Sequence, residues 1–387
     1  MRRTVADSTE EAGDRTRSRL ADINPIPSLF TMAPADRDHE VAVRCGVTVL
    51  VPLLTLLLID RIDLAVFASF GAFTGIYGRN LAHGARLQMQ ARAGALMAVV
   101  LLLATLAGRN GLSGSEQPWA LVGLTTLVAG ACAVTAAYWN LRPSGSLFHI
   151  FAFAAVSSVP FQPPLGEAML TAVLTISFAL LVGISSRVLP RNRHRIERPA
   201  GQPITGRHRL VWSEAAWYVV AAGVAGSLAT ALGPVLGIDH NYWAMVAAVV
   251  PLVGHSTRYR VNRGLQRILG TFLGLVVLAG VLWIHPPLWA IVLIIALLQC
   301  TAELYIARQY VLAQIAVTPL ALLSTVLAMS ASTAAVDTTG LIYDRFVETV
   351  IGALVGMACV ATPWAWRKWV LRLENPSRVT PASGGAG

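Results

Sequence analysis

The sequence predicts an all-α polytopic membrane protein with about 12 transmembrane helices, arranged as two parallel six-helix repeats. Composition is the first observation, because 55% of the 387 residues are hydrophobic and 13% are charged. A typical soluble domain carries about 25% charged residues. The second observation is that the apolar residues fall in blocks, and the third is a motif order that occurs twice. Together these observations exclude a soluble globular enzyme, a disordered chain and a disulfide scaffold.

The apolar blocks give the expected spans in chain order. Each block is bounded by turn-forming or charged residues, and the shortest blocks are compatible with re-entrant as well as spanning segments. The blocks cover residues 41–59, 64–78, 93–108, 118–138, 146–160, 168–189, 215–233, 241–254, 266–284, 287–303, 309–330 and 343–364.

The basic residues indicate the orientation of these spans. With the N-terminus in the cytoplasm, all of the 30 Lys and Arg residues except Arg61, Arg109 and Arg345 fall on the cytoplasmic side. Cytoplasmic loops carry the excess of basic residues in membrane proteins, so both termini are predicted to be cytoplasmic. Lys368 is the single lysine, a usage typical of GC-rich bacterial genomes. The predicted location is therefore a bacterial plasma (inner) membrane.

The motif order in the first half recurs in the second. Ile62-Asp63 opens the second block and Ile238-Asp239 opens the eighth, and each block is followed by an arginine-bearing loop and a Gly-rich helix. Six spans return the chain to its starting side, so the two halves keep the same orientation. We therefore expect a transport pathway between them. The predicted domains are a cytoplasmic tail 1–40, a first repeat 41–189, a basic cytoplasmic linker 190–213, a second repeat 214–366 and a cytoplasmic tail 367–387.

The second half contains a series of motifs with a family resemblance. Asn241-Tyr-Trp-Ala-Met-Val-Ala-Ala-Val-Val-Pro251 is followed by a basic loop and by Arg263-Gly-Leu-Gln-Arg267-Ile-Leu-Gly270-Thr271. This order resembles the fusaric-acid-resistance (FUSC) family, which overlaps the aromatic acid exporters. Arg345-Phe-Val-Glu348 resembles the final-helix motif of that family, whereas the first half matches poorly. The resemblance implies a transporter that exports small organic, often aromatic, acids with an ion gradient as the driving force.

Four arginines at the inner mouth of the eighth and ninth spans are candidate substrate residues: Arg258, Arg260, Arg263 and Arg267. Guanidinium groups beside a low-dielectric wall concentrate carboxylates, and each binds a carboxylate through two parallel hydrogen bonds. Arg267 is the strongest candidate because it lies nearest the apolar core. Enforcement of topology and contact with lipid headgroups explain the same cluster equally well.

Further candidates lie in the eighth and last spans. Tyr242 and Trp243 open the short eighth block, and short segments at matching positions of two repeats point to a transporter's binding site. A thin or tilted helix is the alternative. Arg345 and Glu348 lie three residues apart on one helix face, either toward the translocation path or as an interfacial ion pair.

Glu303 is the candidate for proton coupling. Its position after Trp289 places it within or just below the inner third of the hydrocarbon, where a partly buried carboxylate can carry a proton. A simple ion pair with Arg308 is the alternative interpretation.

The expected partners are a small organic anion and membrane lipids, without nucleic acid, and the sequence leaves a homo-oligomer open. No cofactor, metal site or catalytic residue is predicted, because the eight His are dispersed and no phosphate-binding loop occurs. An enzyme is therefore not expected. The alternatives are a passive anion channel, a structural or regulatory membrane protein and, more remotely, a major-facilitator-type carrier.

Overall fold

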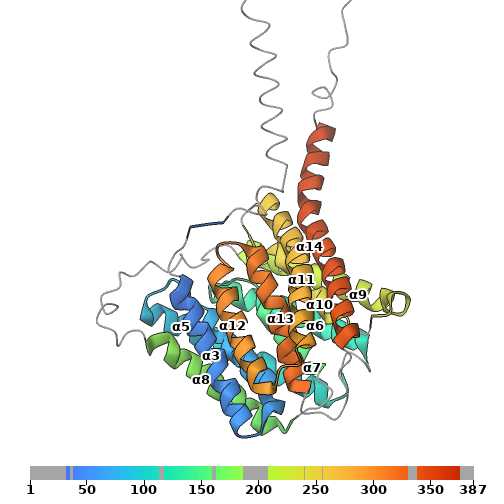
Figure 1. Cartoon of the computed structure of the whole chain (residues 1–387). Coiled ribbons are helices and arrows are strands. Elements are labelled where there is room, and N and C mark those ends of the chain that lie inside the picture. The colour runs from blue at the N-terminus through green and yellow to red at the C-terminus, as the bar shows by residue number, and fades with distance from the viewer. Residues whose placement is uncertain are drawn as a thin grey trace, which may run out of the picture.

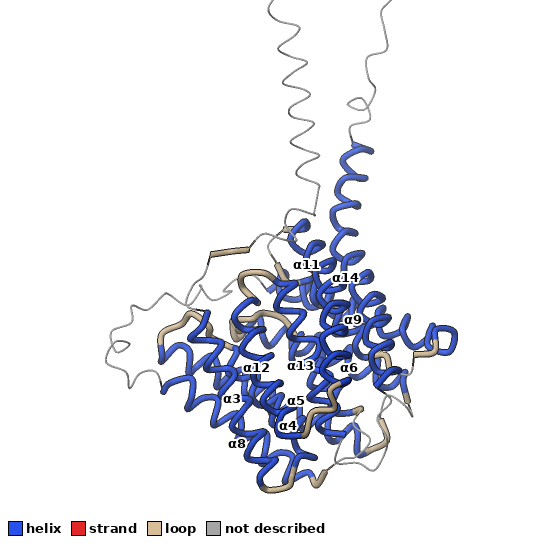
Figure 2. Tube along the Cα trace, in the orientation of Figure 1, coloured by secondary structure: helices blue, strands red, loops and turns tan. Residues whose placement is uncertain are grey.

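The computed structural model describes residues 32–34, 38–112, 117–158, 163–185, 208–238, 240–254, 256–329 and 338–374. Within these ranges every regular element is a helix (Figures 1 and 2). The all-α prediction is therefore confirmed for this part of the chain. The predicted tail 1–40 and linker 190–213 lie largely outside the described residues.

The helices of the first half begin with a long helix and a short broken one. They are α3 (Asp38–Leu58), η1 (Ile62–Leu64), α4 (Ala65–Ala72), η2 (Phe73–Ile76), α5 (His83–Arg109), α6 (Pro118–Tyr138), α7 (Leu147–Ser157) and α8 (Leu165–Ser185). The second half likewise begins with a long helix and a short broken one. Its helices are α9 (His208–Leu236), α10 (Tyr242–Ala248), η5 (Val250–Leu252), α11 (Thr257–Trp283), α12 (Leu288–Tyr305), α13 (Tyr310–Met329) and α14 (Thr338–Glu374).

Nine of the described helices are long and apolar enough to cross a membrane, which establishes a multi-pass membrane protein. The predicted count was about 12. Three shorter apolar segments, Ile62–Ile76, Leu147–Ser157 and Tyr242–Leu252, stand where the second, fifth and eighth spans were expected. These three segments account for the difference.

Two predicted boundaries move in the second half. The helix expected to start at residue 266 starts at Thr257, because the Ser256 hydroxyl caps it by accepting the N–H of Tyr259 at 3.2 Å. The four arginines predicted at the inner mouth of the eighth and ninth spans therefore all lie on α11. The last helix runs to Glu374, past residue 366, and its final turns extend beyond the other helices (Figure 1).

The short helices α4 and α10 lie in the centre of the molecule. Every residue of both helices is buried, as expected for a helix that is apolar all round. α10 continues into η5, which contains Pro251, a residue that lacks the N–H needed to extend an α-helix. A small cavity lies against α4, and the candidate site lies against α10.

Among the described residues, several helix pairs join the two halves. α3 packs against α12 and α6 against α9, while α4 contacts α13 and α7 contacts α10. Within the first half α8 covers α4 and α5, and within the second half α14 covers α10 and α11. Glycines let α14 approach closely: a Cβ added at Gly352 would lie 2.1 Å from the carbonyl oxygen of Ala244. Backbone contact between α14 and α10 fixes the position of the candidate site.

Candidate functional site

Arg345 is a buried cation on α14 that stacks on an indole ring. Its relative exposure is 1%, and its guanidinium carbon lies 3.7 Å from the centre of the Trp243 ring. The ring face stabilises the charge through a cation–π interaction. Nε and Nη1 of Arg345 have no hydrogen-bond partner among the described residues. A buried guanidinium with free donors is suited to an anionic ligand.

Glu348 binds the backbone of the helix turn that carries Trp243. One of its carboxylate oxygens accepts the backbone N–H groups of Trp243 at 2.8 Å and Ala244 at 3.2 Å. These donors belong to the first turn of α10, where no carbonyl within the helix is available to them. Asn241, at the N-cap position, instead donates its amide to Pro118 and Thr230. The carboxylate on α14 therefore takes the place of a local cap.

Arg267 is the second buried arginine, with a relative exposure of 4%. Its Nη1 donates to Oε1 of Gln314 at 3.0 Å and to the Tyr310 hydroxyl at 3.5 Å. The Gln314 amide donates in turn to the hydroxyls of Thr271 and Thr318. Nε of Arg267 has no partner within the described part of the chain. Arg267 lies on α11, which packs against α14, the helix that carries Arg345.

The remaining arginines of α11 lie further from the buried pair. Arg258 is exposed, and Arg260 donates to the carbonyl oxygen of Gly254 at 2.8 Å. The guanidinium carbon of Arg263 lies 4.0 Å from the centre of the Tyr310 ring. Because Tyr310 also contacts Arg267, Arg263 and Arg267 are linked, while Arg258 and Arg260 stand at the end of the helix.

Glu303 pairs across the two halves with a residue that the sequence did not indicate. Nη1 of Arg79 donates to its carboxylate at 2.9 Å, and Nη2 of Arg79 donates to Asp38 at 2.6 Å. The expected alternative partner, Arg308, instead donates to the carbonyl oxygen of Ala33. The alternative pairing of Glu303 with Arg308 is therefore not the one that forms. The proton-coupling role of Glu303 stays a prediction.

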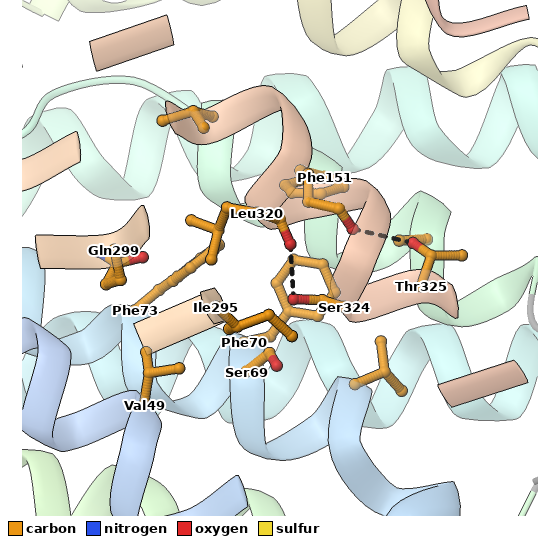
Figure 3. Close-up of a pocket in the computed structure, with 14 residues that line it drawn as sticks. Val49, Ser69, Phe70, Phe73, Phe151, Ile295, Gln299, Leu320, Ser324 and Thr325 are labelled. Carbon is orange, nitrogen blue, oxygen red and sulfur yellow. Dashed lines mark hydrogen bonds between the residues drawn. The ribbon is translucent and has the colours of Figure 1, made fainter. Parts of the chain in front are cut away.

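A small cavity lies between the halves, lined by residues of α3, α4, α7, α12 and α13 (Figure 3). Phe70, Phe151 and Gln299 are among its walls, and its volume is about 40 Å³. That space holds a few water molecules and is too small for an aromatic acid. The Phe151 ring centre lies 4.9 Å from that of Phe70 and 4.8 Å from that of Trp243. Contacting aromatic rings thus connect the cavity to Arg345.

The structure brings together most of the second-half candidates from the sequence. Trp243, Arg345 and Glu348 are in contact, and the Tyr242 ring centre lies 4.7 Å from that of Trp243. Arg267 lies on α11, which packs against α14. Sequence reasoning missed the Gln314–Thr318 pair and Tyr310. The pair had a readable signal, because two polar residues four apart occupy one face of an apolar helix. The sequence carried no signal for the role of Arg79, because its partner Glu303 is remote in sequence.

Comparison with known proteins places a resemblance on this same part of the chain. The "Uncharacterized membrane protein YvaC" of Bacillus subtilis (strain 168) is 27% identical over 133 residues, which are 34% of this chain. The matched region covers 20% of that relative's length. No solved structure matches the chain. Residues 228–359, which contain α10, α11 and most of α14, match the family described as fusaric acid resistance protein-like, so the predicted resemblance is confirmed there.

Proposed function

We propose that this protein is a transporter that exports small organic acids, aromatic acids among them, from a bacterial cytoplasm across the plasma (inner) membrane. The observation that carries the proposal is the buried Arg345 guanidinium on the face of Trp243, with Nε and Nη1 free among the described residues. An aromatic carboxylate matches both parts, because the guanidinium donates charge-assisted hydrogen bonds to the carboxylate and aromatic walls accept the ring.

The polar residues of the second half form a series along the helices. Arg263 and Arg267 lie on the N-terminal part of α11, and Arg345 and Glu348 lie on the N-terminal part of α14. Charged residues inside a membrane protein are costly and typically mark substrate or ion pathways. A cavity too small for the substrate fits a closed state that must open on one side at a time.

The helix contacts support the proposed two-repeat architecture and its topology. If α3 to α8 are matched in order to α9 to α14, the pair α3–α12 corresponds to α9–α6, and α4–α13 to α10–α7. Ion pairs also join segments on the same predicted side. Arg61 pairs with Glu167 on the predicted outer side, and Arg79 pairs with Glu303 on the predicted inner side.

Respiring inverted membrane vesicles test the function. Their interior corresponds to the cell exterior and becomes acidic, so a passively permeating weak acid is driven out of them. Labelled benzoate should nevertheless accumulate in vesicles that contain the protein, above the level in vesicles without it, and the uncharged analogue benzamide should not. Equal benzoate uptake with and without the protein would contradict the proposal.

The same vesicles separate a carrier from a passive anion channel. Valinomycin with K⁺ collapses the membrane potential and leaves the pH gradient. A proton-driven carrier should still accumulate benzoate under this condition, and a protonophore should abolish the accumulation. A passive channel loses its driving force when the potential collapses.

A further inference from the structure

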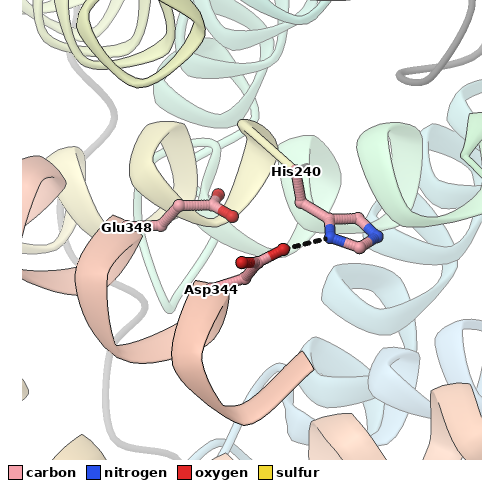
Figure 4. A group of neighbouring side chains, drawn as sticks. All are labelled: His240, Asp344 and Glu348. Atoms are coloured by element: carbon pink, nitrogen blue, oxygen red, sulfur yellow. Dashed lines mark hydrogen bonds and ion pairs between the residues drawn. The ribbon is translucent and has the colours of Figure 1, made fainter. Parts of the chain in front are cut away.

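Three side chains at the N-terminal end of α14 converge next to the arginine site. His240 lies in the connection between α9 and α10, and Asp344 and Glu348 stand one helical turn apart on α14. Nδ1 of His240 lies 2.8 Å from Oδ2 of Asp344. One potential ligand atom from each residue lies within 4.8 Å of the other two. Figure 4 shows the Glu348 carboxylate pointing toward the His240–Asp344 pair.

The burial of the two carboxylates favours a further cation beside them. Asp344 is 4% exposed and Glu348 is 0% exposed, so two acidic groups lie close together away from water. Adjacent buried carboxylates repel each other, and burial of an unpaired anion is costly. Oε1 of Glu348 has no hydrogen-bond partner among the described residues, although the carboxylate turns toward the cluster. That unpaired, buried oxygen is a second observation that points to a ligand at this cluster.

We propose that His240, Asp344 and Glu348 bind a first-row transition-metal dication of the Zn²⁺ type. An imidazole nitrogen favours such ions over Mg²⁺ and Ca²⁺, which take oxygen ligands. Two carboxylates and a neutral imidazole carry a formal charge that balances the dication. Zn²⁺ binds these ligands at about 2.0–2.2 Å, which places tetrahedral ligand atoms about 3.3 Å apart. The spacings of 2.8 Å and up to 4.8 Å span this value.

The surroundings hold the ligands and leave a route for the ion. The second oxygen of Glu348 accepts the N–H groups of Trp243 and Ala244, which orients the carboxylate. The Tyr343 hydroxyl donates to the carbonyl oxygen of Leu236, which ties α14 to the end of α9. The His240 side chain is 39% exposed, so the metal can enter from that side. Three protein ligands leave a fourth position for water.

Metal content of the purified full-length protein tests this site without any substrate. The protein is purified without a polyhistidine tag and equilibrated with Zn²⁺ in detergent. After removal of excess metal, the bound zinc is measured by mass spectrometry. The wild type should retain one Zn²⁺ per chain, whereas His240→Gln and Asp344→Asn should lose it. His285→Gln is the matched control, because His285 is an exposed histidine in another loop, and this variant should bind as the wild type does.

A thermal measurement guards against variants that fail to fold. Zn²⁺ should raise the unfolding midpoint of the wild type and of His285→Gln, because a ligand that binds the folded state stabilises it. Without metal, His240→Gln should unfold cooperatively, and Zn²⁺ should not shift its midpoint. The proposal is overturned if the wild type retains no more zinc than His240→Gln, or if Zn²⁺ shifts both midpoints equally. Benzoate transport is not part of the readout, so a failure here is distinct from a failure of the proposed function.

Discussion

The guanidinium of Arg345 and the indole ring of Trp243 form a buried cation–π pair, with the carbon of the guanidinium 3.7 Å from the ring centre. The pair joins α14 to α10, and Glu348 on α14 accepts the backbone N–H groups of Trp243 and Ala244 in the first turn of α10. The helix α14 therefore supplies both Arg345, which stacks on Trp243, and Glu348, which binds the backbone of Trp243. Nε and Nη1 of Arg345 have no partner among the described residues, so they are available to a ligand.

Replacement of Trp243 should weaken substrate binding through Arg345. Trp243→Leu removes the ring face, and a desolvated cation–π interaction contributes about 2 kcal/mol. We expect the benzoate concentration for half-maximal transport to rise about tenfold or more, with a smaller rise for Trp243→Phe. Thermal unfolding of each purified variant shows whether the fold is retained. Equal half-maximal concentrations in wild type and Trp243→Leu would remove the ring from the site.

Gly352→Ala should disrupt the contact between α14 and α10. The new Cβ would lie 2.1 Å from the backbone oxygen of Ala244, and backbone cannot yield as a flexible side chain does. Overpacking of this kind costs about 1–3 kcal/mol or more, measured by the unfolding midpoint in detergent. Gly280→Ala on α11 is the control, because its Cβ would meet no atom within 4 Å. A midpoint loss of equal size in both variants would contradict the close approach of the two helices.

Arg79→Ala should destabilise the join between the halves. The substitution removes the cation that bridges the buried Asp38 and Glu303 carboxylates, and loss of one partner from a buried ion pair costs about 3–5 kcal/mol. Denaturant unfolding in detergent measures the difference. Arg92→Ala serves as the control, since Arg92 is exposed and makes one long hydrogen bond to a backbone oxygen. Unchanged stability in Arg79→Ala would show that the bridge contributes little.

Glu303→Gln tests the proposed proton coupling. A glutamine cannot release or take up a proton, so the variant should exchange labelled for unlabelled benzoate but should not accumulate it with a pH gradient. Both rates are measured in the same vesicles at equal protein. Full gradient-driven accumulation by Glu303→Gln would exclude Glu303 as the proton carrier and leave it as part of the Arg79 bridge.

Sequence patterns predicted the helical class and the membrane blocks because apolar runs of spanning length need no tertiary information. They also singled out Trp243, Arg267, Arg345 and Glu348, since charged and aromatic residues stand out in apolar segments. The start of α11 was placed too late because its first turns are polar, and the Ser256 cap lies outside the apolar window. Helix ends that project beyond an apolar segment are invisible to hydropathy.

Long-range partners were beyond the sequence. Arg79 meets Glu303, and His240 meets Asp344, only because α3 packs on α12 and α10 packs on α14. The spacing of Asp344 and Glu348 on one helix face was readable, whereas the approach of His240 depends on the fold. Dispersed histidines therefore did not indicate the cluster, although two of its three members were adjacent on α14.

The central claim is that buried guanidinium groups bind the carboxylate of the substrate, and charge-conserving substitutions test it most directly. Lysine keeps the positive charge and the topological bias but lacks the planar fork of arginine. Uptake of labelled benzoate into respiring inverted vesicles is compared at equal protein for Arg345→Lys, Arg267→Lys and the control Arg308→Lys, a half-buried arginine that donates to the Ala33 carbonyl oxygen. We predict at least about tenfold slower uptake at low benzoate for the first two, because a hydrogen bond to a charged group contributes about 1.5–3 kcal/mol, and wild-type uptake for Arg308→Lys. Wild-type uptake in both Arg345→Lys and Arg267→Lys would contradict the account.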